Sequence, residues 1–144
     1  FMAPTVVGDV GNDSRRVRAL DGVFSVSNFG SDSLTIGTWD GAANAAITAT
    51  QAVGDGPLRL DMIALPGGNV AIGNTNFNDS TYSITVVSPT GAVLASSTRP
   101  ADTGCVNPAH PVWLDVGGQL QLVFTCFGSD ALQVSMPEIP APPQ

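Results

Sequence analysis

The sequence of 144 residues contains no lysine, one glutamate and one histidine, and its five basic residues are all arginines. Twelve acidic residues outweigh these five, so the formal net charge at pH 7 is −7. Nucleic acids and anionic membrane surfaces both require a cationic protein face, so this charge argues against either partner. Uninterrupted apolar runs of about 18 residues are also lacking, and no segment therefore predicts a membrane-spanning helix.

The composition that remains is that of a loop-rich β-protein. Hydrophobic residues make up 43% of the chain and charged residues 12%, which is enough apolar surface for one buried core. The 16 glycines and 11 prolines leave little room for long helices. Apolar and polar residues alternate at residues 23–27, 83–87 and 119–124, which is the period of a half-buried strand. We therefore expect an all-β domain without helices.

A nine-residue segment occurs three times, at residues 28–36, 76–84 and 126–134. The phenylalanines in second place, Phe29, Phe77 and Phe127, are separated by 48 and then 50 residues. A second segment, a loop, repeats in the same register at residues 7–11, 53–57 and 103–108. Repeats of about 45 to 50 residues with four short strands each are typical of β-propeller blades.

The repeat unit has a recognisable order of elements. A glycine-containing loop leads to a strand, a Gly-Gly turn, and a strand ending in a segment such as Ser-Asn-Phe-Gly-Ser-Asp (27–32), followed by two further strands. This pattern resembles the YVTN-type and NHL-type β-propeller repeats over roughly residues 5–136. The resemblance implies four-stranded antiparallel blades and a secreted or cell-surface protein of bacteria or archaea. It implies no particular activity, because propellers host many functions.

Using this resemblance, we divide the chain into three blades (residues 1–136) and a proline-rich tail (137–144). Blade one takes strands at 15–20, 23–28, 33–38 and 45–52, and blade two at 58–65, 69–74, 82–88 and 92–98. Blade three takes strands at 111–116, 119–125 and 131–136 and lacks an outer strand. The tail has four prolines in eight residues, which excludes an ordered ladder strand there.

The missing outer strand is expected at the other end of the chain. Residues 5–9 align with residues 50–55, where the outer strand of blade one ends. Three blades are too few for a closed ring of the usual four to eight. We therefore expect a six-bladed homodimer in which each chain gives its N-terminal strand to its partner's third blade. A filament built by the same strand donation and a chain that is a piece of a longer propeller are the alternatives.

Cys105 and Cys126 fall on one face of the third blade, while the other two blades have no cysteine there. We expect a disulfide between them, which favours a secreted, periplasmic or cell-surface location. Two buried free thiols are the alternative. The N-terminus lacks the basic flank and long apolar run of a signal peptide, so we expect a processed chain or one without such a signal.

Three aspartates, Asp32, Asp79 and Asp130, occur once in each blade. An enzyme rarely needs the same carboxylate in every blade, whereas a turn does, because aspartate side chains bond to nearby loop backbone. We therefore interpret them as structural turn residues. Calcium binding is the alternative.

Arg15, Arg59 and His110 are predicted at equivalent places near the start of each inner strand. Inner strands line a propeller's channel, so these side chains would form a basic ring at its mouth. Such a ring would bind a carboxylate or phosphate anion through charge-assisted hydrogen bonds. The alternative is that each arginine pairs with a loop aspartate of its own or the next blade.

Catalytic patterns are sparse. Glu138 is in the tail, no Gly-x-Ser-x-Gly motif occurs, and no metal-ligand spacing is present. Trp39 and Trp113 occupy different strand positions, unlike the repeated pockets of propeller lectins. We therefore expect a non-catalytic binding or assembly module without metal or cofactor, with a small anion, glycan or protein as ligand. A hydrolase or lyase with a site on the channel face, a filament subunit and a lectin are the alternatives.

Overall fold

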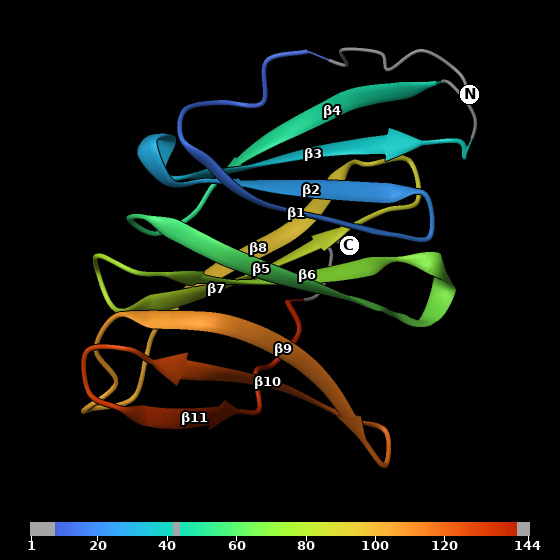
Figure 1. The fold of residues 1–144 in the computed structure, drawn as a ribbon. Coiled ribbons are helices and arrows are strands. Elements are labelled where there is room, and N and C mark those ends of the chain that lie inside the picture. Colours follow the sequence, from blue (N-terminus) through green and yellow to red (C-terminus); the bar gives the residue numbers. More distant parts are fainter. Residues whose placement is uncertain (1–7, 42–43, 141–144) are drawn as a thin grey trace.

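The computed structural model describes residues 8–41 and 44–140, and three antiparallel β-sheets account for most of them (Figure 1). The first sheet has strands in the order β1 (Ser14–Leu20), β2 (Val23–Asn28), β3 (Ser33–Trp39) and β4 (Ala45–Ala52). The second sheet follows with β5 (Pro57–Ala64), β6 (Val70–Asn76), β7 (Thr81–Val87) and β8 (Val93–Pro100). The third sheet contains β9 (Pro108–Val116), β10 (Gln119–Cys126) and β11 (Ala131–Ser135).

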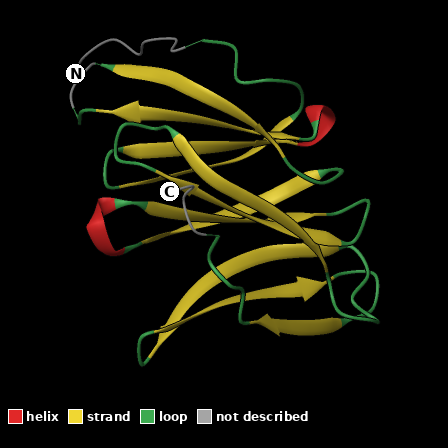
Figure 2. Ribbon diagram, turned by 180° about the vertical axis from the view of Figure 1, so that it is seen from behind, coloured by secondary structure: helices red, strands yellow, loops and turns green. Residues whose placement is uncertain are grey.

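The predicted all-β class is confirmed, and each of the eleven strands predicted between residues 15 and 136 has its counterpart. The largest difference is at β9, which begins at Pro108 rather than at residue 111, because Pro108 already pairs with Cys126 on β10. The only helical turns in the described ranges are two short 3-10 turns, Phe29–Ser31 and Pro66–Gly68 (Figure 2). No helix in this part of the chain is long and apolar enough to cross a bilayer.

The three sheets stack like consecutive propeller blades. The first strand of each sheet is the inner one, so that β1 lies beside β5 and β5 beside β9 (Figure 1). One core cluster fills the seam between the first two sheets and includes Leu34, Ile36, Leu60 and Ile72. A second cluster fills the next seam and includes Tyr82, Ile84, Trp113, Leu122 and Phe124. The sheets are thus held together by apolar side chains contributed from both sides of each seam.

The three loops between the second and third strands of each sheet repeat in geometry as well as in sequence. The amides of Phe29, Phe77 and Phe127 donate to the carbonyls of Asp13, Gly56 and Asn107 at 3.0, 2.9 and 3.1 Å. Asp13, Gly56 and Asn107 all have left-handed backbone, with φ of 53°, 70° and 53°. Glycine, asparagine and aspartate tolerate this conformation best, which explains the choice of residue. The internal repeat is therefore a real structural repeat.

The third sheet is closed by a disulfide and a returning tail. Cys105 and Cys126 form the predicted disulfide, which joins the loop before β9 to the end of β10. After β11 the chain turns back towards β8, where an Arg99 side-chain N–H donates to the Glu138 carbonyl at 3.4 Å (Figure 1). Ile139 packs against the core cluster between the second and third sheets. Of the N-terminal strand predicted to complete this sheet, residues 5–9, residues 5–7 lie outside the described residues.

Candidate functional site

The basic residues of the inner strands are placed by a β-bulge. In β1 the register shifts between Ser14 and Arg16, so that Arg16 pairs with Ser27. In β5 the same shift leaves Arg59 opposite Thr75, the equivalent position in the second sheet. Arg16 rather than Arg15 is therefore the structural counterpart of Arg59. A bulge adds one residue to a strand, and sequence spacing alone does not show on which residue it falls.

Arg15 points to a different surface. Its guanidinium forms an ion pair with Asp13 in its own loop and lies over the ring of Phe29, 4.9 Å from the ring centroid. Both side chains of the ion pair are exposed, so the contact contributes little to stability. The structure thus gives Arg15 a partner in its own loop, as the alternative interpretation of the sequence expected.

Arg59 and His110 do come together, in company with two other arginines. Arg16 and Arg18 from β1, Arg59 from β5 and His110 from β9 line one cavity of about 140 Å³. We call these four residues the arginine cluster. Leu60, Pro111 and Val112 complete the walls and supply an apolar surround. Three arginines and a histidine are therefore brought together where the three inner strands meet.

Asp61 is the carboxylate that joins these strands. One of its oxygens lies 3.7 Å from Nε of Arg18 on β1. The other accepts a hydrogen bond of 2.9 Å from the backbone amide of Trp113 on β9. Asp61 thus bridges all three sheets. Arg18 and Asp61 occupy the same register level, opposite Ser25 and Gly73 respectively, which the sequence does not reveal before the bulges are located.

Arg59 has unused hydrogen-bonding capacity. Its Nε atom is buried and has no hydrogen-bond partner among the described residues. A buried donor without an acceptor costs free energy, and a bound anion would remove that cost. His110 lies beside it with left-handed backbone, φ 51°, at the irregularity where β9 passes Phe124. The site therefore combines an unsatisfied donor with a non-glycine residue in a sparsely populated conformation.

The repeated loop aspartates bond to neighbouring loops. Asp32, with φ of 48°, accepts a hydrogen bond of 2.9 Å from the amide of Gly56, the loop residue before β5. Ser80, with φ of 55°, occupies the same place in the second sheet and accepts from the amide of Asn107 at 3.3 Å. Ser80 rather than Asp79 is therefore the counterpart of Asp32. Each such bond fastens the start of the next sheet.

Asp79 holds the same loop in another way. It accepts from the amide of Asp55 at 2.9 Å and from the hydroxyl of Thr81 at 2.7 Å. Asp130 again has left-handed backbone, with φ of 49°. In the described part of the chain, no three histidine, cysteine, aspartate or glutamate side chains lie together as metal ligands.

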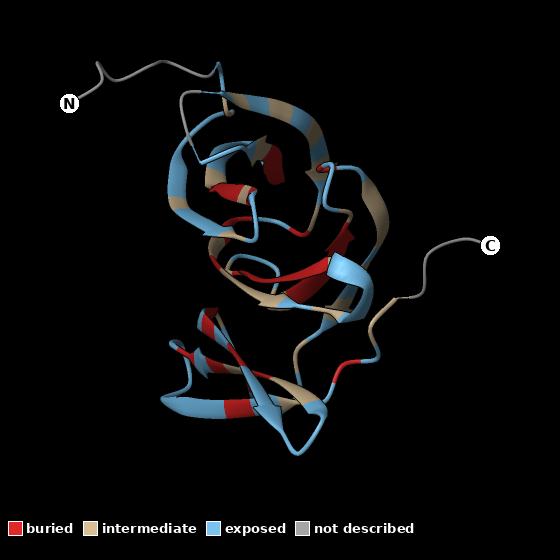
Figure 3. Ribbon diagram, turned by 90° about the vertical axis from the view of Figure 1, so that its right-hand side faces the viewer, coloured by how far each residue is buried: buried red, intermediate tan, exposed pale blue. Residues whose placement is uncertain are grey.

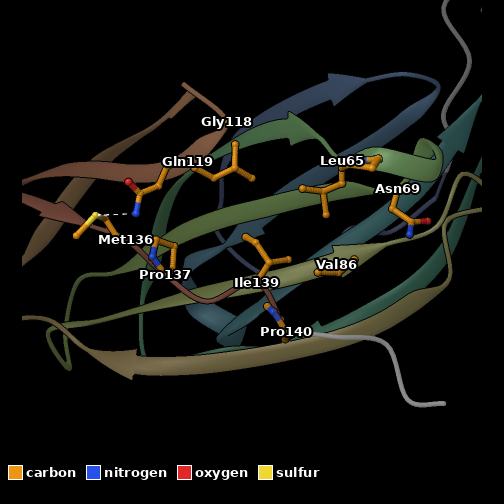
Figure 4. A pocket seen from close by; sticks show the side chains of 11 residues that line it. Leu65, Asn69, Val86, Gly118, Gln119, Met136, Pro137, Ile139 and Pro140 are labelled. Atoms are coloured by element: carbon orange, nitrogen blue, oxygen red, sulfur yellow. Dashed lines mark hydrogen bonds between the residues drawn. The ribbon is translucent and has the colours of Figure 1, made fainter. Parts of the chain in front are cut away.

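A second cavity, of about 490 Å³, lies where the tail crosses the seam between the second and third sheets (Figure 4). Leu65, Val86, Ile139 and prolines of the tail give it a mainly apolar lining, and Gln119 donates to the sulfur of Met136 at 3.2 Å. It contains no ionisable side chain. Its lining gives no chemistry for catalysis.

The two tryptophans lie apart. Trp113 is buried in the core cluster between the second and third sheets. Trp39 is exposed at the end of β3 in the first sheet. The two side chains therefore do not form a repeated aromatic pocket.

Comparisons with known proteins add little. No model of a known protein family matches the chain, and no curated protein is similar to it in sequence. A solved structure, that of a protein from Lactobacillus plantarum, is similar with a TM-score of 0.48 and 14% sequence identity. The match covers 81% of this chain and 38% of that protein, so the chain spans well under half of its length. No function follows from this likeness.

Proposed function

We propose that the protein is a non-catalytic binding module whose arginine cluster holds a small carboxylate or phosphate anion. The observation that carries this proposal is that Arg59, whose buried Nε has no hydrogen-bond partner in the described residues, lines a cavity together with Arg16, Arg18 and His110. A planar guanidinium presents several N–H donors that fit carboxylate and phosphate oxygens in pairs. An anion is therefore the ligand that best satisfies the hydrogen-bonding capacity of these arginines.

The charge balance supports the same conclusion. Asp61 contacts the cluster through Arg18, while three arginines line the cavity. The protein as a whole carries a formal net charge of −7, so this concentration of positive charge stands out against an acidic background. Partial burial strengthens the attraction between a guanidinium and an anion, because the local dielectric constant is lower than that of water.

Two further properties belong to the proposal. The disulfide is typical of proteins in oxidising compartments and supports a secreted, periplasmic or cell-surface location. The propeller-like sheets support the YVTN-type or NHL-type resemblance and, with it, self-association of the chain into a six-bladed ring through its N-terminal strand. A filament formed by the same strand exchange is the open-ended form of that assembly.

The anion site is tested by isothermal titration with inorganic phosphate and with citrate at constant ionic strength. We expect binding to the wild-type protein and a loss of about tenfold or more in affinity for Arg59→Ala, as for one charge-assisted contact. Arg99→Ala is the matched control, because it removes the same charge from the outer strand β8, where the guanidinium lies 4.0 Å from Glu138. Absence of binding to the wild-type protein, or equal loss in both variants, would refute the anion site.

A further inference from the structure

The seams between sheets follow one rule of burial. The third strands β3 and β7 place alternate apolar residues on the face that the next sheet covers. Leu34 and Ile36 on β3 have no exposed surface, because the second sheet packs over them. Tyr82 and Ile84 on β7 are buried in the same way under the third sheet. We call this side of a sheet its trailing face.

The third sheet has the same residues on its trailing face, and they are uncovered. Register makes Leu132 and Val134 on β11 the counterparts of Leu34 and Ile36, because Cys126 pairs with Ala131 as Asn28 pairs with Ser33. Leu132 is nevertheless 65% exposed and Val134 52% exposed. The burial colouring shows the contrast between the buried central strands of the second sheet, β6 and β7, and the more exposed third sheet (Figure 3).

The first sheet exposes part of the complementary face, although Val26 and Thr35 on it are buried and the Thr35 hydroxyl donates to the Val10 carbonyl. At the seam with the first sheet, the second sheet presents Leu60 and Val87, both buried. Their counterparts in the first sheet are Val17, which is 61% exposed, and Trp39, which is also exposed. We call this side the leading face. The first and third sheets thus expose apolar residues at the positions that pack together at both internal seams.

The hydrogen bond that connects the sheets at each internal seam has an equivalent donor position in the first sheet and an equivalent acceptor position in the third. At the internal seams, the left-handed residues Asp32 and Ser80 accept from the amides of Gly56 and Asn107. Asp130 has the acceptor's conformation, with φ of 49° against 48° for Asp32. Asp13 has the donor's conformation, with φ of 53°, the same as that of Asn107. One acceptor and one donor are therefore placed for a further seam.

We propose that a second copy of this chain covers the trailing face of the third sheet with the leading face of its own first sheet. In this contact Val17 packs against Leu132 and Val134, and the amide of Asp13 donates to the carboxylate of Asp130. The second copy is the occupant because a sheet of the same repeat covers this face at both internal seams. Each copy carries both faces, so two copies joined twice close a ring of six sheets. The inference rests on the self-association proposed above and assigns the surface that performs it.

The test measures the mass of the protein by light scattering and sedimentation velocity at about 10 to 100 µM, where an association with a micromolar Kd is populated. We expect twice the chain mass of 14.7 kDa for the wild-type protein. Val134→Asp should weaken the association by about 100-fold or more, because the carboxylate would be buried without a partner. Val17→Asp should do the same from the other side of the contact.

Val106→Asp is the matched control. Val106 is in the loop before β9 and is 46% exposed, close to the value for Val134. Its counterpart in the second sheet is Asp55, since the amides of Asn78 and Gly128 donate to the carbonyls of Asp55 and Val106 respectively. The repeat therefore accepts aspartate at this position, and the control should remain a dimer. Circular dichroism checks that all three variants are folded.

A wild-type monomer at 100 µM would overturn both this contact and self-association as a whole, as expected if the face is covered instead by further blades of a longer polypeptide. A Val134→Asp variant that stays dimeric, while a chain lacking residues 1–7 becomes monomeric, would overturn this contact and leave strand exchange in place. Open-ended polymers in place of a dimer would overturn the closed ring. An equal mixture of the Val134→Asp and Val17→Asp variants should form a dimer. In that pair, the unchanged trailing face of one chain packs against the unchanged leading face of the other.

Discussion

Removal of the disulfide tests how the third sheet is held. This sheet has three strands in the described part of the chain, and its outer strand β11 leaves Leu132 and Val134 exposed. Cys105 and Cys126 are both buried in the core cluster at the seam with the second sheet. The double variant Cys105→Ala/Cys126→Ala removes the covalent link and leaves no free thiol.

The expected magnitude comes from loop closure. The two cysteines are separated by 21 residues in sequence. In the chain-entropy relation, a link across a loop of this size destabilises the unfolded chain by about 3 kcal/mol. Globular domains are stable by only about 5 to 15 kcal/mol, so this loss is a large share of the total. We therefore expect the double variant to be folded but to lose about 3 kcal/mol of unfolding free energy.

The assay is equilibrium unfolding in urea, followed by circular dichroism and extrapolated to water. The wild-type protein with reductant should approach the double variant, whereas reductant should leave the double variant itself unchanged. An unchanged unfolding midpoint and slope in the double variant would refute the reasoning. It would mean that packing at the seam alone holds the third sheet in place.

Two other substitutions test packing and polar contacts at the same seam. Gly73→Ala would place a methyl group 2.7 Å from Cδ1 of Leu122 and 2.9 Å from Nε1 of Trp113, so we expect a loss of about 1 to 3 kcal/mol in urea unfolding. A variant as stable as the wild-type protein would show that the side chains at this seam rearrange around the added methyl group without cost. Asp61→Ala leaves the Trp113 amide without its acceptor. We expect the free energy of unfolding to fall by about 1 to 3 kcal/mol, which would be measured as a lower thermal unfolding midpoint. An unchanged midpoint would contradict the bridging role of Asp61.

Much of the fold could be predicted because the repeat is explicit in the sequence. Alternation of apolar and polar residues located the strands, and the spacing of Phe29, Phe77 and Phe127 located the repeated loops. The disulfide followed from where the two cysteines fall in the third repeat. These features depend on local sequence. The strands and loops recur in every repeat, and the two cysteines belong to the same repeat. Closure into a ring depends on contacts between chains and stays a prediction.

The site was harder to predict because it depends on register. Sequence spacing gave Arg15, Arg59 and His110 equivalent strand positions, but with the register shift Arg16 and Ala109 are the residues level with Arg59 on β1 and β9. The same shift brings Arg18 level with Asp61, which contacts both neighbouring inner strands. A bulge is set by how a strand fits its neighbours, and a single strand's sequence carries little of that information. The repeated loop residue was likewise displaced by one, to Ser80 from Asp79.

The position of the second sheet has a consequence for how the chain opens. This sheet is covered on one side by the first sheet and on the other by the third, whereas each end sheet has one neighbour. In a single chain that has not associated with a second copy, this linear array lets an end sheet open without disrupting the rest. Backbone amides of β6 and β7 should therefore exchange with solvent most slowly, and proteases should cut first in the end sheets. The part of the structure that opens most slowly should therefore be the middle of the sequence.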